Sequence, residues 1–201
     1  MSRSFGVLAV VGLLVACSDV ADKSSATSAL STSVVTTVAE STTTDAPSTT
    51  VAITSSSGDP GVNFSFPEGN FEAYFPAEPA VFPGSPTLVE SDGVDGFYSV
   101  SFGPYDKAIT ADDLTKFALA ADHMVTETYG ATLTESVAVE LDGVAGRQAK
   151  GFTDTDDIWV TIHADGQRIY TLVSVVTSGE PRLADEARGF HEHFHIIGVG
   201  S

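Results

Sequence analysis

The chain has 201 residues, enough for one domain of ordinary size with an additional segment, or for two very small domains. Its 27 acidic and 9 basic residues give a formal charge of −18, which excludes a protein that binds nucleic-acid phosphates or anionic lipid through a surplus of Lys and Arg. The single cysteine, Cys17, excludes an intramolecular disulfide and a metal site with several thiolate ligands.

The first segment has the pattern of an export signal. Arg3 and the amino terminus supply positive charge, and an apolar run of 12 residues follows over 5–16. At about 1.5 Å per residue this run is too short to cross a hydrocarbon core of about 30 Å, whereas it has the usual length of a signal-peptide core. The sequence therefore predicts a signal peptide over 1–16. A short membrane anchor or a buried helix is the alternative.

The end of that run resembles the lipobox of bacterial lipoproteins, with Leu14-Val-Ala-Cys17 directly after the apolar core. The resemblance implies cleavage before Cys17 and a diacylglycerol on its sulfur. Two acyl chains anchor a protein durably, because each buried CH₂ contributes about 0.8 kcal/mol. We therefore expect a protein attached to the cell membrane by lipid and facing outward. Ordinary secretory cleavage near Ala16 is the alternative.

The residues after the cysteine are predicted to form a disordered stalk, so that 17–59 comprises the lipidated Cys17 and this stalk. Ser, Thr and Ala account for 27 of the 42 residues in 18–59, and aromatic residues are absent there. Such a segment buries too little apolar surface to offset its chain entropy. A flexible chain of this length spans about 35 Å, enough to hold the next domain clear of a membrane.

Residues 60–201 are predicted to form a single α+β domain, with 22 acidic and 7 basic residues. We expect an antiparallel sheet of about six strands, some of them short, with two main helices packed on it. The strand 169–176 is apolar on both faces and is therefore placed centrally in the sheet. The six predicted strands are 70–75, 96–102, 133–141, 147–153, 158–163 and 169–176, and the segments 87–90 and 196–197 are candidates for further short strands.

Two segments carry helical signals. In 110–129, Thr110 can cap the amino terminus, and apolar residues recur at helical spacing from Leu114 to Val125. The last helix is predicted to begin at Pro181, with a buried stripe of Leu183, Ala187, Phe190 and Phe194. Asp142-Gly143 and Asp165-Gly166 are predicted to form tight hairpin turns.

Several sequence motifs make the domain similar to the PsbP/Mog superfamily over about residues 66–197. They are Phe75-Pro76 at a strand end, Tyr129-Gly130 at a helix end, the turn 141–147, the strand start 168–170, and the paired Phe190 and Phe194. The chain departs from the family at His193, where members often carry Ser. The resemblance implies a non-enzymatic accessory or binding module without a shared catalytic residue set.

The run His191-Glu-His-Phe-His195 contains the candidate metal ligands. His191 and His195 share a face if the run is helical, and His191, His193 and His195 share one if it is extended. The zinc-hydrolase spacing His-Glu-x-x-His is absent. In the alternative interpretation, Phe190 and Phe194 are the buried anchors and the histidines are exposed neighbours at a helix end.

Other candidate groups are weaker. His163 is interpreted as a half-exposed sheet histidine on the face of Trp159, and His123 as a surface residue. Three carboxylates, Asp154, Asp156 and Asp157, could hold calcium but are more typical of a solvated turn.

Three cations of the predicted sheet, Arg147, Lys150 and Arg168, either form an anion-binding face or pair with carboxylates on neighbouring strands. Arg147 and Arg168 are therefore weak candidates for ligand binding. Nucleophilic-serine and phosphate-binding glycine motifs are absent.

These observations favour a non-enzymatic, membrane-anchored envelope lipoprotein that acts as a binding or accessory module. The expected partners are the membrane, through the lipid, and an envelope protein or a small molecule; we expect no cofactor and no nucleic acid. The alternatives are a metal-binding protein or metal-dependent enzyme that uses the C-terminal histidines, and a purely structural envelope protein.

Overall fold

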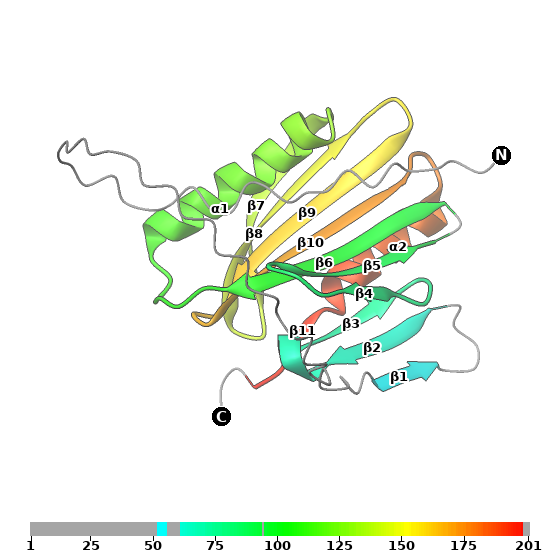
Figure 1. Ribbon diagram of the computed structural model, residues 1–201. Helices are drawn as coiled ribbons and strands as arrows, with labels where there is room; N and C mark the ends of the chain where they lie inside the picture. Colours follow the sequence, from blue (N-terminus) through cyan, green and yellow to red (C-terminus); the bar gives the residue numbers. More distant parts are fainter. Residues whose placement is uncertain (1–51, 56–60, 94, 199–201) are drawn as a thin grey trace, which may run out of the picture. The chain divides into compact units, whose positions relative to one another are not determined.

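The computed structural model describes residues 52–55, 61–93 and 95–198, which belong to one unit, Thr49–Ser201 (Figure 1). The predicted signal peptide 1–16, Cys17 and most of the predicted stalk lie outside these residues. Four residues assigned to the stalk, Ala52–Ser55, instead form strand β1, which pairs with β2.

The α+β class with two main helices is confirmed, and the expected antiparallel sheet of about six strands corresponds roughly to the larger of two antiparallel sheets; the smaller sheet was not predicted. The larger sheet has seven strands in the order β4-β5-β6-β10-β9-β8-β7. The bounds of these strands are Ala80–Phe82 (β4), Thr87–Asp92 (β5), Gly96–Pro104 (β6), Thr132–Leu141 (β7), Val144–Phe152 (β8), Asp156–Ala164 (β9) and Arg168–Thr177 (β10). The smaller sheet has the order β1-β2-β3-β11, with β2 at Val62–Phe66, β3 at Phe71–Phe75 and β11 at His195–Ile196.

Strand β10 lies at the centre of the larger sheet, as its sequence predicts. It pairs with β6 on one side and β9 on the other, and all eight residues of 169–176 are buried. Its side chains alternate between two cores: Leu172 belongs to one and Val173 to the other. The sheet therefore needs a covering layer on both faces.

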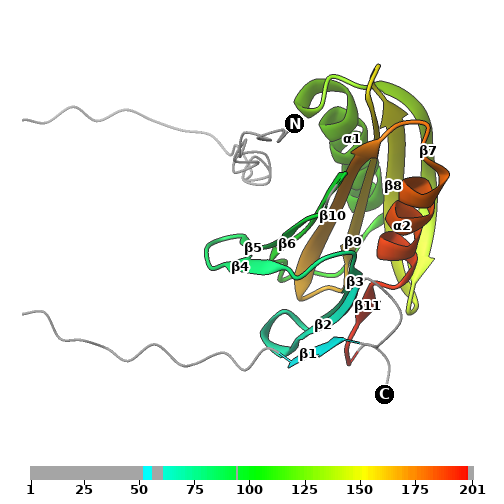
Figure 2. The ribbon, with the colours of Figure 1, turned by 90° about the vertical axis from the view of Figure 1, so that its right-hand side faces the viewer.

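Those layers come from different elements (Figure 2). Helix α1, Ala111–His123, packs on one face over β7, β8 and β9. Helix α2, Pro181–Glu192, packs on the opposite face over β10, β6 and β9, and it also contacts β3 of the smaller sheet. The buried stripe predicted for α2 is confirmed, since Leu183, Ala187 and Phe190 lie in the core.

The smaller sheet arises from an alternation that the sequence analysis overlooked. Val62, Phe64 and Phe66 are the buried residues of β2, with exposed or half-buried residues between them. A short 3-10 turn, Pro67–Gly69, then returns the chain into β3, whose Phe71 and Phe75 are fully buried. Phenylalanines of both strands pack against each other and against α2, so this sheet closes the core on the α2 side.

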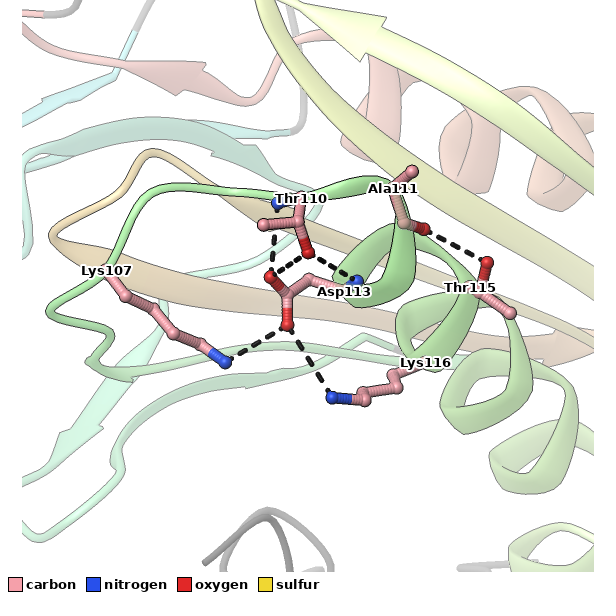
Figure 3. Close-up of polar contacts among 6 residues, drawn as sticks. All are labelled: Lys107, Thr110, Ala111, Asp113, Thr115 and Lys116. Carbon is pink, nitrogen blue, oxygen red and sulfur yellow. Dashed lines mark hydrogen bonds and ion pairs between the residues drawn. The ribbon is translucent and has the colours of Figure 1, made fainter. Parts of the chain in front are cut away.

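The amino terminus of α1 is fixed by a capping box (Figure 3). The Thr110 hydroxyl accepts the Asp113 backbone N–H at 3.2 Å, and the Asp113 carboxylate accepts the Thr110 backbone N–H at 3.1 Å. Lys107 Nζ donates to the same carboxylate at 3.0 Å. The bonds from Thr110 and Lys107 hold the pKa of Asp113 well below its usual range. The helix continues beyond His123 as a π turn, Met124–Thr128.

The two predicted hairpin turns differ in outcome. Asp142 and Gly143 both have positive φ, and the two-residue turn between β7 and β8 is confirmed. The connection between β9 and β10 comprises three residues, Asp165–Gln167, rather than two. There the Asp165 carboxylate accepts the backbone N–H groups of Gln167 and Arg168, which stabilises a longer turn.

The packing around Phe190 predicts that truncation of its side chain strongly destabilises the folded domain. Its fully buried ring lies 5.2 Å from the Phe75 ring and 5.4 Å from the Tyr98 ring. We expect Phe190→Ala to lower the free energy of unfolding by about 3–5 kcal/mol, measured by urea denaturation. Phe82→Ala, at a side chain that is 50% exposed, is the control and should change it by less than about 0.5 kcal/mol. Equal effects would contradict this account of the core.

Candidate binding groove beside the last helix

A groove of about 350 Å³ lies between α2 and the outer part of the larger sheet. Its most buried polar residues are Thr161, His163 and His191. The other residues that line it are Val139, Leu141, Trp159, Gln148, Lys150, Glu140, Arg188 and Glu192. It thus combines apolar surface, both signs of charge and buried hydrogen-bonding groups, which is the usual composition of a ligand site.

The groove exists because α2 covers only part of its sheet face. The helix packs on β10, β6 and β9, while α1 packs on the other face of β7 and β8. Strand alternation directs Trp159, Thr161 and His163 to the α2 side of β9. The register places Lys150 and Gln148 of β8 opposite Trp159 and Thr161, so all five residues share one face.

At the base of the groove, His191 of α2 is inserted between two strand hydroxyls. Its Nδ1 lies 2.9 Å from Thr161 Oγ1, and its Nε2 lies 3.1 Å from Ser174 Oγ. Gln148 Nε2 donates to the same Thr161 hydroxyl at 3.0 Å. Each ring nitrogen of His191 thus faces one hydroxyl, which can either donate to it or accept from it.

This environment favours the neutral ring of His191. Burial lowers its pKa to about 3, and electrostatic interaction with the neighbouring His163 and Lys150 acts in the same direction. A neutral imidazole uses one nitrogen as donor and the other as acceptor, which matches the hydrogen bonds that this residue makes. His191 is consequently a polar link between α2 and the sheet rather than a cationic residue.

His163 is the second buried histidine of the groove. It is 3% exposed, so the interpretation of a half-exposed sheet residue is wrong; that interpretation did not include the cover that α2 supplies. Burial lowers its pKa to about 4. Its ring lies against Gly146 of β8, where a Cβ would come within 2.4 Å of Nδ1. Its Nδ1 is buried, and none of the residues that the structure describes offers it a hydrogen-bond partner.

Trp159 forms the aromatic part of the groove. The Lys150 Nζ lies 4.3 Å from the centre of the indole ring and 2.8 Å from Glu135 Oε2 on the neighbouring strand. The His191 ring lies 5.8 Å from the indole. Lys150 is thus held by a carboxylate and an aromatic face together.

The three C-terminal histidines do not converge. His191 is buried, so the expectation of three exposed neighbours is wrong for it, whereas His193 and His195 are exposed as expected. The His193 ring lies beside Tyr74, and His195 Nδ1 lies 3.3 Å from Asp142 Oδ2. Among the described residues, no group of three or more His, Cys, Asp or Glu side chains is placed to hold a metal ion.

The remaining candidates have local partners. Arg147 Nε donates to the Leu114 carbonyl at 3.3 Å and so attaches α1 to the sheet. Arg168 Nη2 donates to the Glu68 carbonyl at 3.2 Å and links the larger sheet to the 3-10 turn. Arg147 and Lys150 lie on opposite faces of β8, so the three cations form no common anion-binding face, and only Lys150 pairs with a strand carboxylate.

The carboxylates of the predicted acidic turn and His123 have structural or surface positions, and Asp156 and Asp157 are the first two residues of β9. Asp156 accepts a hydrogen bond from Thr155, and Asp157 accepts one from Ser178 at 2.5 Å. These bonds stabilise the turn region. His123 is exposed on α1, as expected.

A second depression of about 540 Å³ lies near the beginning of β10 and includes Arg168. It is more open than the groove, and turn residues such as Ser85 and Pro86 form much of its lining. Neither buried histidine contributes to it. The groove beside α2 is therefore the better candidate site.

No protein-family model matches the chain, and no curated protein sequence matches it either. The choice of the groove as the candidate site is therefore based on the geometry of its residues. Sequence reasoning singled out His163, His191 and Lys150 separately, but it missed Gln148, Thr161 and Ser174. The strand alternation over 158–163 was the available signal, since it places Thr161 and His163 on the face of Trp159.

The buried histidines predict a stability that falls with acidification. Their pKa values are lowered from 6.5 to about 3 and about 4, so below pH 6.5 the unfolded chain binds protons that the folded domain does not. We expect the free energy of unfolding to fall between about pH 6.5 and pH 5, approaching about 1.4 kcal/mol per pH unit for each histidine. Urea denaturation at several pH values across this range measures how steeply the free energy of unfolding changes with pH.

The variant His191→Gln isolates one of these contributions. With one buried histidine fewer, the free energy of unfolding should change less steeply with pH, by the contribution of that histidine. His123→Gln, on the exposed side of α1, should leave the pH dependence as in wild type. If His191→Gln and wild type had the same slope, His191 would not be held neutral in the folded state.

Proposed function

We propose that the chain is an outward-facing lipoprotein of the cell envelope, anchored through Cys17, whose folded domain is a non-enzymatic binding or accessory module. The lipobox pattern Leu14–Cys17 and the Ser/Thr/Ala-rich segment after it support the anchor and the stalk. Within the described residues, no helix is long and apolar enough to cross a membrane. We also propose that the domain is PsbP/Mog-like, supported by its α+β organisation and its buried Phe190 and Phe194.

The groove beside α2 is the observation that carries the binding function. It presents the indole of Trp159, the apolar side chains of Val139 and Leu141, and the amide of Gln148 within one cavity of about 350 Å³. Apolar contact provides affinity for a small molecule, and the few polar groups fix its orientation.

Burial argues for binding rather than catalysis at this site. Ser174 and His191 form a hydrogen-bonded pair of the kind that activates a nucleophile. However, Ser174 is fully buried between β10 and α2, so a substrate has no access to its hydroxyl. Both ring nitrogens of His191 already contact hydroxyls, which leaves neither free for a metal ion.

The groove can be tested through its own chromophore, because Trp159 is the only tryptophan of the chain. We expect at least one compound from a panel of sugars, amino acids, nucleotides and short-chain amphiphiles to change the tryptophan emission in a saturable way. Lys150→Ala should weaken that binding about tenfold or more, because it removes the cation over the indole.

Lys116→Ala is the matched control, since Lys116 lies on α1 at the opposite face, and it should bind like wild type. A panel without any saturable response, or equal weakening by both variants, would count against the groove as the binding site.

The anchor has a separate test. Cys17→Ser should shift the protein from the membrane fraction to the soluble fraction, and mass spectrometry should find a diacylglyceryl group on wild type alone. Ser18→Ala is the control and should stay in the membrane fraction. An unmodified Cys17 on a wild-type protein that is released into the medium would overturn the anchoring proposal.

A further inference from the structure

Strand β7 is the longest open edge of the domain. It has ten residues and is the outermost strand of the seven-stranded sheet, at whose margin Figure 2 shows it. Among the residues that the structure describes, no strand pairs with its outer side. The other edge strands, β4, β1 and β11, have three, four and two residues.

The register of the β7–β8 hairpin shows which backbone groups are free. The two-residue turn closes on the pair Leu141 and Val144. In an antiparallel pair, residues that exchange hydrogen bonds with the partner alternate with residues whose N–H and C=O groups point away. Counted from the turn, the outward groups belong to Glu140, Ala138 and Ser136. They form a continuous template for another strand.

The part of β7 near the turn has few of the features that usually protect an edge, and its one charged side chain is that of Glu140. It contains no Pro and no Lys, and the only irregularity in its pairing lies between Leu133 and Glu135, near the start of the strand. Val137, Val139 and Leu141 are half-buried on the face that carries the groove. An added strand could therefore pack alternate apolar side chains beside this row.

Charge indicates which partner fits this edge. The domain carries 22 acidic and 7 basic residues over 60–201, so a second copy of the chain would meet strong repulsion. Glu140 is exposed on β7, and Glu192 is exposed at the end of α2 beside the groove. By strand alternation the Glu140 side chain lies on the face opposite to Val137 and Val139, so it favours basic side chains at the positions of an added strand that alternate with the apolar ones.

We propose that β7 receives an extended basic segment of a partner protein as an eighth strand of the sheet. Backbone pairing with Ser136, Ala138 and Glu140 fixes the register of that segment. Its apolar side chains lie next to Val137 and Val139, and its basic side chains lie near Glu140. This inference rests on the proposed binding role of the domain and specifies the class of partner.

The experiment uses a synthetic ten-residue peptide of alternating valine and lysine, with both ends blocked, and the full-length protein. We expect the peptide to slow amide hydrogen exchange at Ser136, Ala138 and Glu140 by about tenfold or more at saturation, measured by NMR. A peptide with glutamate in place of lysine should give no protection, because it meets the acidic edge with like charge.

Two variants separate the backbone contribution from the charge contribution. Ala138→Pro removes one outward N–H and should abolish the protection, whereas Ala138→Ser keeps the N–H and should bind like wild type. Glu140→Lys should weaken binding of the lysine peptide about tenfold. Thermal denaturation of each variant establishes that the domain is folded.

Several outcomes would overturn the proposal. They are no protection along β7, equal binding of the lysine and glutamate peptides, or a dimer in light scattering whose β7 amides are already protected without peptide. The two proposals can be contradicted separately. A protein that binds the peptide but none of the small molecules would contradict the groove as a small-molecule site. A protein that binds a small molecule but not the peptide would contradict only the proposal that β7 receives an added strand. Lys150→Ala should weaken only small-molecule binding.

Discussion

The placement of α2 across β9 and β10 is the constraint on which the rest of the domain depends. Phe190 fixes the helix in the core through contacts with Phe75 and Tyr98, which belong to different sheets. One residue further along, His191 reaches the strand hydroxyls of Thr161 and Ser174. The same turn of helix therefore joins the two sheets, buries a titratable ring and forms one wall of the groove.

The polar contact within this interface limits the position of the helix more than apolar packing alone would. A hydrophobic surface allows small shifts, whereas a buried imidazole with two hydroxyl partners must keep both of them or lose hydrogen bonds in a dry environment. His163 adds a second buried ring nearby, for which Gly146 leaves space. The geometry of the groove is thus held by the groups that also make it sensitive to acid.

The uncovered part of the sheet follows from where its covering elements pack. Helix α2 packs on β10, β6 and β9, while the smaller sheet closes the core on the α2 side. Strands β7 and β8 therefore keep one half-exposed face, and β7 keeps a free edge. Under the proposed anchoring, this face and edge of an acidic domain would be presented to other envelope components, which is the arrangement expected of a binding module.

The sequence by itself determined the features that depend on local pattern. The N-cap at Thr110, the buried stripe of α2, the turn at Asp142-Gly143 and the central place of β10 all follow from spacing along one segment. The segment 62–66 also alternates, but it is short, and its assignment to a second sheet depends on its pairing with β1 and β3. Only the tertiary structure decided that His163 and His191 are buried and that Gln148, Thr161 and Ser174 surround them, because burial of a strand or helix face depends on which distant element covers it.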